Sequence, residues 1–250
     1  MPLVIAGIAA IAGGAINALA GGGTLITFPV LTALGLPAVV ANVTNTVALC
    51  PGYFGAAWSQ RSDLAGKAGE LWIYIPLSLA GGILGGYLLL QSGEELFSEL
   101  VPILILAASL LLAIQGPLNR RLLKRKVKED KGIRAKINTA VLLFPAAIYG
   151  GYFGAGISVI ILAVLGIFSR ESLTKLNSIK QAIAFSVNIA AAVYFIFSSN
   201  VNWSFAAVMA AGALAGGFLG GRLAGAIKQE TLRRIVVIIG VAVALAYWLA

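Results

Sequence analysis

The sequence predicts an all-α integral membrane protein built from two inverted repeats of five apolar segments each. Hydrophobic residues make up 60% of the 250-residue chain and charged residues only 11%, whereas a soluble domain carries about 25% charged residues. Apolar runs of roughly 20 residues recur, which is long enough to cross a hydrocarbon core of about 30 Å. The second half also repeats the first at one constant offset.

The composition excludes several classes of function. The chain has no histidine and one cysteine, Cys50, so it has no disulfide framework and lacks the groups for Ser-His-Asp catalysis and for most zinc and haem sites. We therefore expect no metal, no cofactor and no enzymatic activity. The net charge of +9 does not indicate nucleic-acid binding, because the basic residues fall in links between apolar segments. The expected partner is the lipid bilayer.

Five apolar segments precede a hydrophilic linker and five follow it. They are expected at 3–19, 25–36, 37–59, 71–90 and 100–115, then at 137–152, 157–167, 173–197, 203–222 and 232–249. This division makes residues 1–116 the first membrane repeat, 117–136 a basic linker and 137–250 the second repeat. The third segment begins at Pro37, because proline suits the first turn of a helix.

An internal repeat supports this division. When the chain is shifted by 135 residues without a gap, residues 79–88 align with 214–223, and eight of the ten positions are identical. At the same offset Asn42 aligns with Asn177. One constant offset over about 90 residues indicates duplication of a five-segment unit.

The charges predict the orientation, since cytoplasmic loops are enriched in Lys and Arg. All 18 basic residues fall on one side if both termini lie outside and the linker is cytoplasmic. The link after the fourth segment carries only acids, Glu94, Glu95 and Glu99. Because each repeat has an odd number of segments, the two repeats are inverted relative to each other.

The second segment of each repeat is too short to cross the membrane upright. Residues 25–36 and 157–167 each supply about 12 apolar residues, which makes a helix of roughly 18 Å. We interpret them as broken or re-entrant half-helices. The sequence leaves open whether each forms a half-depth hairpin or a tilted crossing. Such interrupted helices are typical of inverted-repeat transporters, whose site lies near the bilayer midplane.

Small residues precede each short segment at equivalent positions. Glycines leave backbone N–H groups accessible just before a helix N-terminus, which carries about half a positive charge and binds anions. A hydroxyl follows the glycines in each half. We expect the two breaks to form one anion site, although glycines also let membrane helices pack closely. The candidate residues are Gly21, Gly22, Gly23, Thr24, Gly156 and Ser158.

Each half also carries a polar triplet on one helix face of its third segment. The triplets are Asn42, Asn45 and Thr46, and Asn177, Lys180 and Gln181. An ionisable residue within a span is a functional candidate by default, and an anion is the natural partner of Lys180. The alternative is a lysine that snorkels to the cytoplasmic face. Further along, Ser186 and Asn188 either line a cavity or hydrogen-bond between helices.

These motifs resemble those of a known family. Ala-Gly-Gly-Gly-Thr at 20–24, followed by Phe-Pro-Val-Leu at 28–31 and the polar run 41–46, looks like the first-half motif of TauE/SafE-type sulfite and organosulfonate exporters. This family is also called the toluene-sulfonate uptake permeases. The second half is similar at 149–156 and 176–180, so the resemblance covers nearly the whole chain. It implies a multi-pass transporter of sulfur-containing anions in the prokaryotic plasma (inner) membrane.

We therefore predict a transporter that binds a small sulfur-containing oxyanion and moves it by alternating access of the two repeats. The alternatives are an anion channel of the same architecture, a non-transporting assembly subunit and, least favoured, a membrane enzyme. All nine acidic residues fall in links or at segment ends, so a buried proton relay is not expected. The exact anion, the direction, the coupling ion and a possible homo-oligomer stay open.

Overall fold

The computed structural model describes every residue except 20, 125–131, 169–170, 199–200, 224–228 and 250. This described part is helical, with one short 3₁₀ turn, η1 (Arg61–Leu64), and no strand. Its helices are α1 (Pro2–Leu19), α2 (Thr24–Ala33), α3 (Ala38–Ser59), α4 (Ala68–Lys124), α5 (Ile133–Tyr152), α6 (Ile157–Phe168), α7 (Leu173–Ser198), α8 (Trp203–Leu223) and α9 (Gln229–Leu249). Each predicted apolar segment coincides with a helix or with one arm of α4, which confirms the all-helical class.

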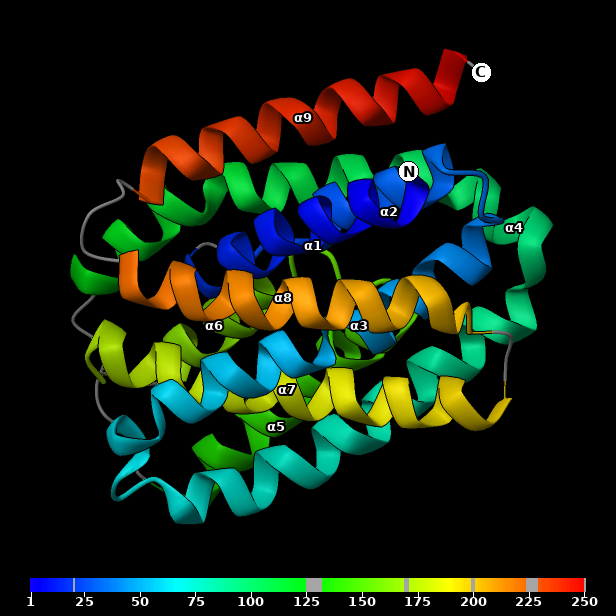
Figure 1. The fold of residues 1–250 in the computed structure, drawn as a ribbon. Helices are drawn as coiled ribbons and strands as arrows, with labels where there is room; N and C mark the ends of the chain where they lie inside the picture. Colours follow the sequence, from blue (N-terminus) through cyan, green and yellow to red (C-terminus); the bar gives the residue numbers. More distant parts are fainter. Residues whose placement is uncertain (20, 125–131, 169–170, 199–200, 224–228, 250) are drawn as a thin grey trace.

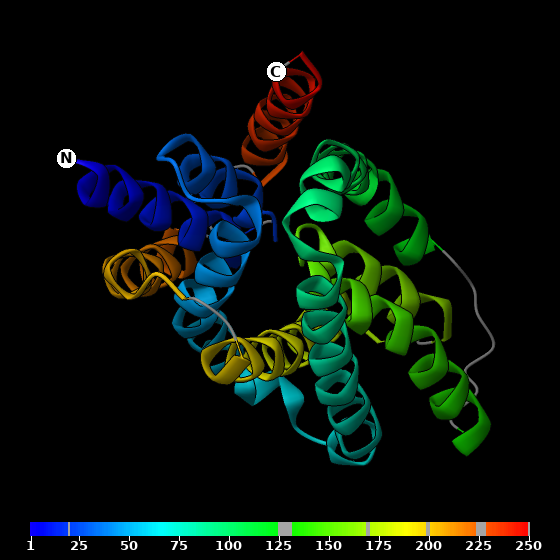
Figure 2. The same ribbon diagram turned by 90° about the vertical axis from the view of Figure 1, so that its right-hand side faces the viewer.

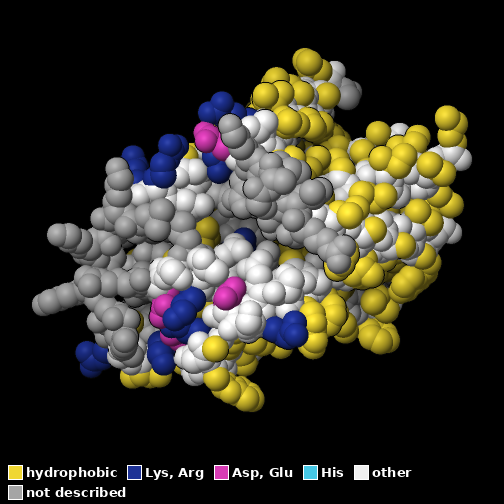
Figure 3. Space-filling model, turned by 60° about the vertical axis from the view of Figure 1, so that its left-hand side comes forward, with side chains coloured by type: hydrophobic (Ala, Val, Ile, Leu, Met, Phe, Trp, Pro, Cys, Tyr) yellow, Lys and Arg dark blue, Asp and Glu magenta, His cyan; other side chains and the backbone are white. Residues whose placement is uncertain are grey.

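The helices run back and forth between two ends of the molecule (Figure 1). Both chain termini lie at one end, which we call the terminal end. At the other end α3 and α6 finish and α7 and α9 begin. We call it the basic end, after Arg61, Lys67, Lys175 and Arg234. Figure 3 shows Lys, Arg and acidic side chains gathered there, and hydrophobic side chains gathered mainly on the opposite side of that view.

Helix α4 reverses direction at Gly93, which divides it into two arms. Gly93 has φ 71° and ψ −179°, a left-handed conformation that suits glycine. The sequence predicts a link between segments at Glu94, Glu95 and Glu99. That expectation was wrong, because all three residues are helical and the reversal needs only the glycine.

The second arm of α4 is fastened to α3 at this bend. The Glu94 carboxylate accepts hydrogen bonds from the backbone N–H of Ala38 and, at 3.0 Å, from that of Val39. These N–H groups begin α3, where the helix dipole favours a negative charge. Glu94, which the sequence placed in a link between segments, thus caps the N-terminus of α3, the helix that carries the first polar triplet.

Two helix pairs approach closely through the repeated glycines. Helix α1 packs along α8, and the first arm of α4 packs along α5. A Cβ at Gly85 would lie 2.0 Å from the Ile148 carbonyl oxygen, and one at Gly216 would lie 1.9 Å from that of Ile11. Seen from the terminal end (Figure 2), α8 lies with α1–α3 on one side and α5 and α6 lie with α4 on the other. These glycines serve helix packing.

The described part has five helices long and apolar enough to cross a membrane, namely α1, α4, α7, α8 and α9. Helices α2 and α6, with 10 and 12 residues, are too short. Helices α1 and α2 form a hairpin open toward the terminal end, whereas α5 and α6 form one open toward the basic end (Figure 1). The tips of both hairpins, at 21–24 and 155–159, are buried. Each hairpin therefore has its tip inside the molecule.

Candidate functional site

The two helix breaks meet inside the molecule. Gly21 has φ 78° and Gly156, its equivalent at an offset of 135, has φ 74°, so both breaks need glycine for the same reason. A Cβ at Gly21 would lie 2.6 Å from the Ser158 Cβ and 2.8 Å from its Oγ. Gly156 backs onto Ala108 of α4. The tip of the first hairpin therefore lies against the first turn of α6.

The glycine triplet is only partly free to donate. The Gly23 N–H donates to Asn17 Oδ1 at 2.8 Å, so the expectation that all three glycines present free N–H groups was wrong. Gly22 packs against Leu112 of α4 rather than facing a cavity. Within the described residues the N–H groups of Gly22 and Thr24 donate no hydrogen bond. Thr24 is the first residue of α2, where the helix dipole is positive.

A small enclosed cavity adjoins the breaks, near the middle of α3 and α7. It offers about 10 Å³ to the centre of a water-sized sphere, close to the room that one water molecule needs. Its apolar walls come from α3, α7 and the second break. Its polar walls come from five side chains, Thr24, Asn45, Thr46, Tyr53 and Asn188. Three of these, Thr24, Asn45 and Thr46, were candidates from the sequence.

Two buried amide oxygens in the cavity wall have no partner among the described residues. These atoms, Asn45 Oδ1 and Asn188 Oδ1, accept no hydrogen bond there, whereas most buried polar atoms in proteins are paired. No Asp, Glu, Lys or Arg lines the cavity. Amide and hydroxyl groups can donate to an oxyanion or accept from other ligands. The cavity is thus a neutral polar cage, and a ligand larger than water requires its walls to move apart.

The polar triplet of the second half lies beside the cavity but does not line it. Lys180 is 5% exposed, and its Nζ donates to Asn177 Oδ1 at 2.5 Å. Asn177 Nδ2 in turn donates to Gln60 Oε1, at the end of α3, at 2.8 Å. Gln181 is 2% exposed, and its Nε2 has no hydrogen-bond partner. The structure thus keeps the two triplets apart.

The remaining candidates have mainly structural contacts. Asn42 Nδ2 donates to the Tyr152 carbonyl oxygen at 2.8 Å, which joins α3 to the end of α5. Ser186 Oγ donates to the Ala182 carbonyl oxygen of its own helix at 2.8 Å. Asn188, which the sequence left between two roles, lines the cavity.

Sequence reasoning missed three residues of this region. Asn17 binds the first break, Tyr53 lines the cavity and Gln60 joins α3 to α7. Asn17 could have been noticed as a polar residue within an apolar run just before the break. Tyr53 could have been noticed because it aligns with Asn188 at the offset of 135.

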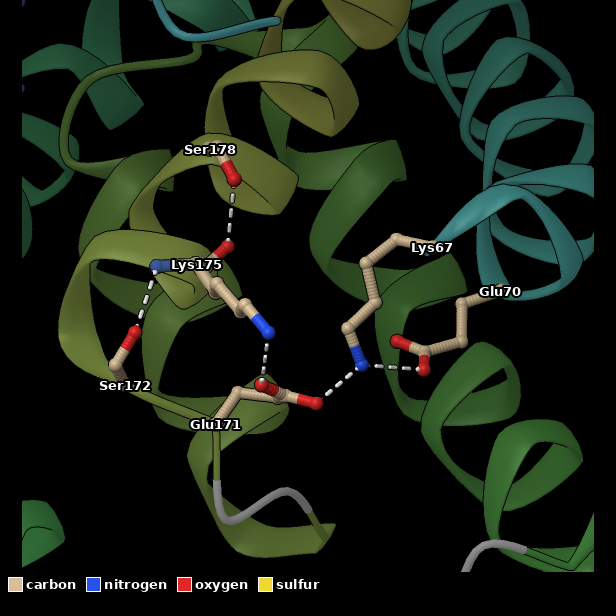
Figure 4. Close-up of polar contacts among 6 residues, drawn as sticks. All are labelled: Lys67, Glu70, Glu171, Ser172, Lys175 and Ser178. Atoms are coloured by element: carbon tan, nitrogen blue, oxygen red, sulfur yellow. Dashed lines mark hydrogen bonds and ion pairs between the residues drawn. The ribbon is translucent and has the colours of Figure 1, made fainter. Parts of the chain in front are cut away.

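A cluster of ion pairs links the two halves at the basic end (Figure 4). Lys67, just before α4, pairs with Glu171, just before α7, and at 2.9 Å with Glu70. Glu171 also pairs with Lys175 at 3.4 Å. Burial lowers the pKa of Lys67, but its bonds to Glu171 and Glu70 outweigh burial and raise the pKa above 10.5. The bond from Lys67 outweighs burial and lowers the pKa of Glu171 below 4.5.

Within the described residues no three Cys, Asp or Glu side chains lie close enough together to hold a metal ion.

Comparison with known proteins identifies relatives along the whole chain. The family described as "Sulfite exporter TauE/SafE" matches residues 5–247. A "Probable membrane transporter protein" of Haemophilus influenzae is 28% identical over 90% of this chain and 85% of its own length. "Probable membrane transporter protein ORF9" of a Sinorhizobium species is 25% identical over 95% and 89%, and Escherichia coli YfcA is 24% identical over 90% and 82%. No solved structure matches the chain significantly.

Proposed function

Because the chain belongs to the TauE/SafE sulfite exporter family, we propose that it transports a small sulfur-containing oxyanion, sulfite or an organosulfonate, across the plasma membrane. The observation that carries this proposal is the cavity between the two breaks. It places the side-chain amides of Asn45 and Asn188, whose Oδ1 atoms have no partner among the described residues, near the start of α2 at Thr24. The donors for an anion are the N–H groups of these amides and the hydroxyl groups beside them, near the positive end of a helix.

The proposed site extends from the cavity to the neighbouring candidates of both halves. Thr24, Asn45, Thr46 and Asn188 hold the anion when the cavity expands, and the free N–H groups at the first break add donors. Ser158 contributes a hydroxyl from the second break, which lies against Gly21. The small volume of about 10 Å³ supports a closed state between two open ones, because a cavity of this size admits only about one water molecule.

The helix pairing supports an arrangement of two equivalent repeats. Helix α1 of the first half packs on α8 of the second, and α5 of the second half packs on α4 of the first. The offset of 135 residues aligns α1 with α5 and the first arm of α4 with α8, so the two contacts correspond to each other in the repeat. In the proposed mechanism the repeats rock about the cavity, which opens it alternately to the terminal end and to the basic end. The basic end is the cytoplasmic one, as the enrichment of Lys and Arg predicts.

Transport by purified protein in liposomes tests this proposal. The panel is sulfite, sulfate, thiosulfate, sulfoacetate and taurine, each with and without proton, sodium and potential gradients, and protein-free liposomes are the control. We expect saturable flux of at least one sulfur oxyanion and exchange of labelled anion against unlabelled anion. Flux without exchange would indicate a channel, and absence of flux from folded protein would contradict transport.

A further inference from the structure

The cavity is asymmetric with respect to the repeat. Tyr53 and Asn188, which align at the offset of 135, both line it. Asn45 and Thr46 also line it, but their equivalents, Lys180 and Gln181, do not. The repeat therefore relates the cavity, at Asn45 and Thr46, to a second position between α3 and α7, at Lys180 and Gln181.

Lys180 lies directly beyond the cavity on the path to the basic end. It precedes the cavity residue Ala184 by four residues, so it shares that face of α7 and lies one turn, roughly 6 Å, closer to the basic end. On α3 the cavity residue Tyr53 is followed on the same face by Gln60, two turns further toward that end. Helices α3 and α7 pack against each other, so polar groups continue from the cavity toward the basic end.

The groups at this second position are donors that the described residues satisfy only in part. Lys180 is 95% buried, and within the described chain no carboxylate lies within 4.0 Å of it and its Nζ donates only to Asn177. Its neighbour Gln181 is 98% buried, and its Nε2 donates to no group of the described residues. A buried cation without a counter-charge is strongly destabilising unless an anion joins it. Two such donors side by side suit an oxyanion.

We propose that Lys180 and Gln181 form a second anion position, which receives the oxyanion at the basic end and exchanges it with the cavity at Asn45 and Thr46. This inference rests on the proposed transport function. It adds that Lys180 and Gln181 bind the anion at the basic end, before Asn45 and Thr46 bind it in the cavity. In the present structure contacts between the two halves close this position from the basic end. They are the Gln60–Asn177 hydrogen bond and the Lys67–Glu171 ion pair.

Transport measured from each face of the membrane tests the second position. Sulfite is the probe, and oriented vesicles present either the basic end or the terminal end to it. Lys180→Gln removes the charge, Lys180→Arg keeps it, and Arg234→Gln removes an exposed charge at the same end, since Arg234 is 74% exposed. A hydrogen bond to a charged group corresponds to roughly tenfold or more in affinity.

For Lys180→Gln we expect the half-saturating sulfite concentration to rise about tenfold or more at the basic end and to change little at the terminal end. Arg234→Gln should resemble the wild type at both ends, and Lys180→Arg, which keeps the charge, should raise the half-saturating concentration at the basic end less than Lys180→Gln does. Equal values for Lys180→Gln and the wild type, or an equal rise at both ends, would overturn the inference while leaving transport intact.

Thermal unfolding of the purified variants with sulfite gives a readout independent of transport. Sulfite should raise the unfolding temperature of the wild type and of Arg234→Gln, and this rise should be smaller in Lys180→Gln, because only the cavity then binds the anion. If the wild type moves no anion but shows this Lys180-dependent rise, the proposed function fails and the second position stands. If sulfite stabilises Lys180→Gln as much as the wild type, the second position is refuted.

Discussion

Gly21 and Ser158, which are 137 positions apart in the sequence, lie in direct contact at the meeting of the two helix breaks. No side chain fits between them, because a Cβ at Gly21 would lie 2.6 Å from the Ser158 Cβ. Each break alone is a short interruption of a helix. Their contact places the start of α6 beside the tip of the first hairpin, and the cavity lies next to this junction.

Gly21→Ala should destabilise the protein through both strain and overlap. The positive φ of 78° costs a non-glycine residue about 1–2 kcal/mol, and the forced contact with Ser158 adds about 1–3 kcal/mol. Thermal unfolding in detergent measures the loss. The matched control is Gly35→Ala, since Gly35 has φ 93° and no atom within 4 Å of the added Cβ. An equal loss in the two variants would show that the contact with Ser158 contributes nothing.

Asn45→Leu should remove binding of the transported anion at the cavity without lowering basal stability. Among the described residues the buried Asn45 Oδ1 has no partner, and replacing an unpaired buried polar group by an apolar one is close to neutral or stabilising. A ligand at a hundredfold its dissociation constant stabilises a protein by about 2.7 kcal/mol, and the part of this gain that the cavity provides should be lost. The measurement is thermal unfolding with and without sulfite.

Asn119→Leu is the control for that experiment. Asn119 Oδ1 is also buried without a partner, but Asn119 does not line the cavity. We expect this variant to keep the full gain from sulfite. Loss of the gain in both variants would indicate a general effect of removing buried amides rather than a site at Asn45.

Glu171→Gln should lower stability at neutral pH by about 0.5–1 kcal/mol, because it removes partly exposed ion pairs. The pKa of Glu171 is lowered in the folded protein, so its contribution is full above the ordinary pKa of 4.5 and is lost as the pH falls through the folded value. The pKa of Lys67 is raised above 10.5, so its contribution is lost only as the pH rises through that higher value.

Chemical unfolding at pH 7 and at successively lower pH measures this effect. The difference between Glu171→Gln and the wild type should shrink as the pH falls below 4.5. Glu230→Gln serves as control, since Glu230 pairs with Arg234 at 2.9 Å but is 53% exposed, and it should change stability little at any pH. A difference for Glu171→Gln that persists unchanged in acid would contradict a role of its charge.

Gly85→Ala should separate the first arm of α4 from α5. The added Cβ would lie 2.0 Å from the Ile148 carbonyl oxygen, and such backbone overlap costs about 1–3 kcal/mol. Gly55→Ala is the control, because its nearest neighbour would be Leu214 Cδ1 at 3.9 Å, which is ordinary contact. Thermal unfolding of both variants is the measurement. A loss of stability in Gly85→Ala alone would support close packing of α4 on α5, whereas an equal loss in both would indicate that these helices do not tolerate alanine in general.

The helices and their interruptions could be predicted because they depend on local sequence. Each apolar run forms a helix, and the short segments begin at the glycines where they were expected, at Thr24 and Ile157. The bend at Gly93 was missed because polar helical residues at a membrane surface resemble a loop in composition. Glu94 is helical there and caps α3 by accepting from the N–H groups of Ala38 and Val39. These two residues precede Glu94 by 56 and 55 positions, so the contact leaves no local pattern in the sequence.

The candidate site was only partly predictable. Thr24, Asn45 and Thr46 were identified and line the cavity, whereas the equivalent Lys180 and Gln181 lie one turn outside it. Spacing along a helix shows which residues share a face, but it does not show how far one helix has slid along its neighbour. Tyr53 enters the cavity for that reason, because the register of α3 against α7 sets which residues face each other.

Hydropathy, charge placement and internal similarity therefore decided the helical membrane class, the breaks and the polar faces, since these properties depend on neighbours along the chain. Tertiary packing decided that Gly21 meets Ser158, that Asn17 takes the Gly23 N–H, and that the cavity holds Asn45 rather than Lys180. The physical reason is that close glycine contacts, such as Gly85 on α5 and Gly216 on α1, position whole helices against one another. Small axial shifts between packed helices then determine which buried polar groups share a space.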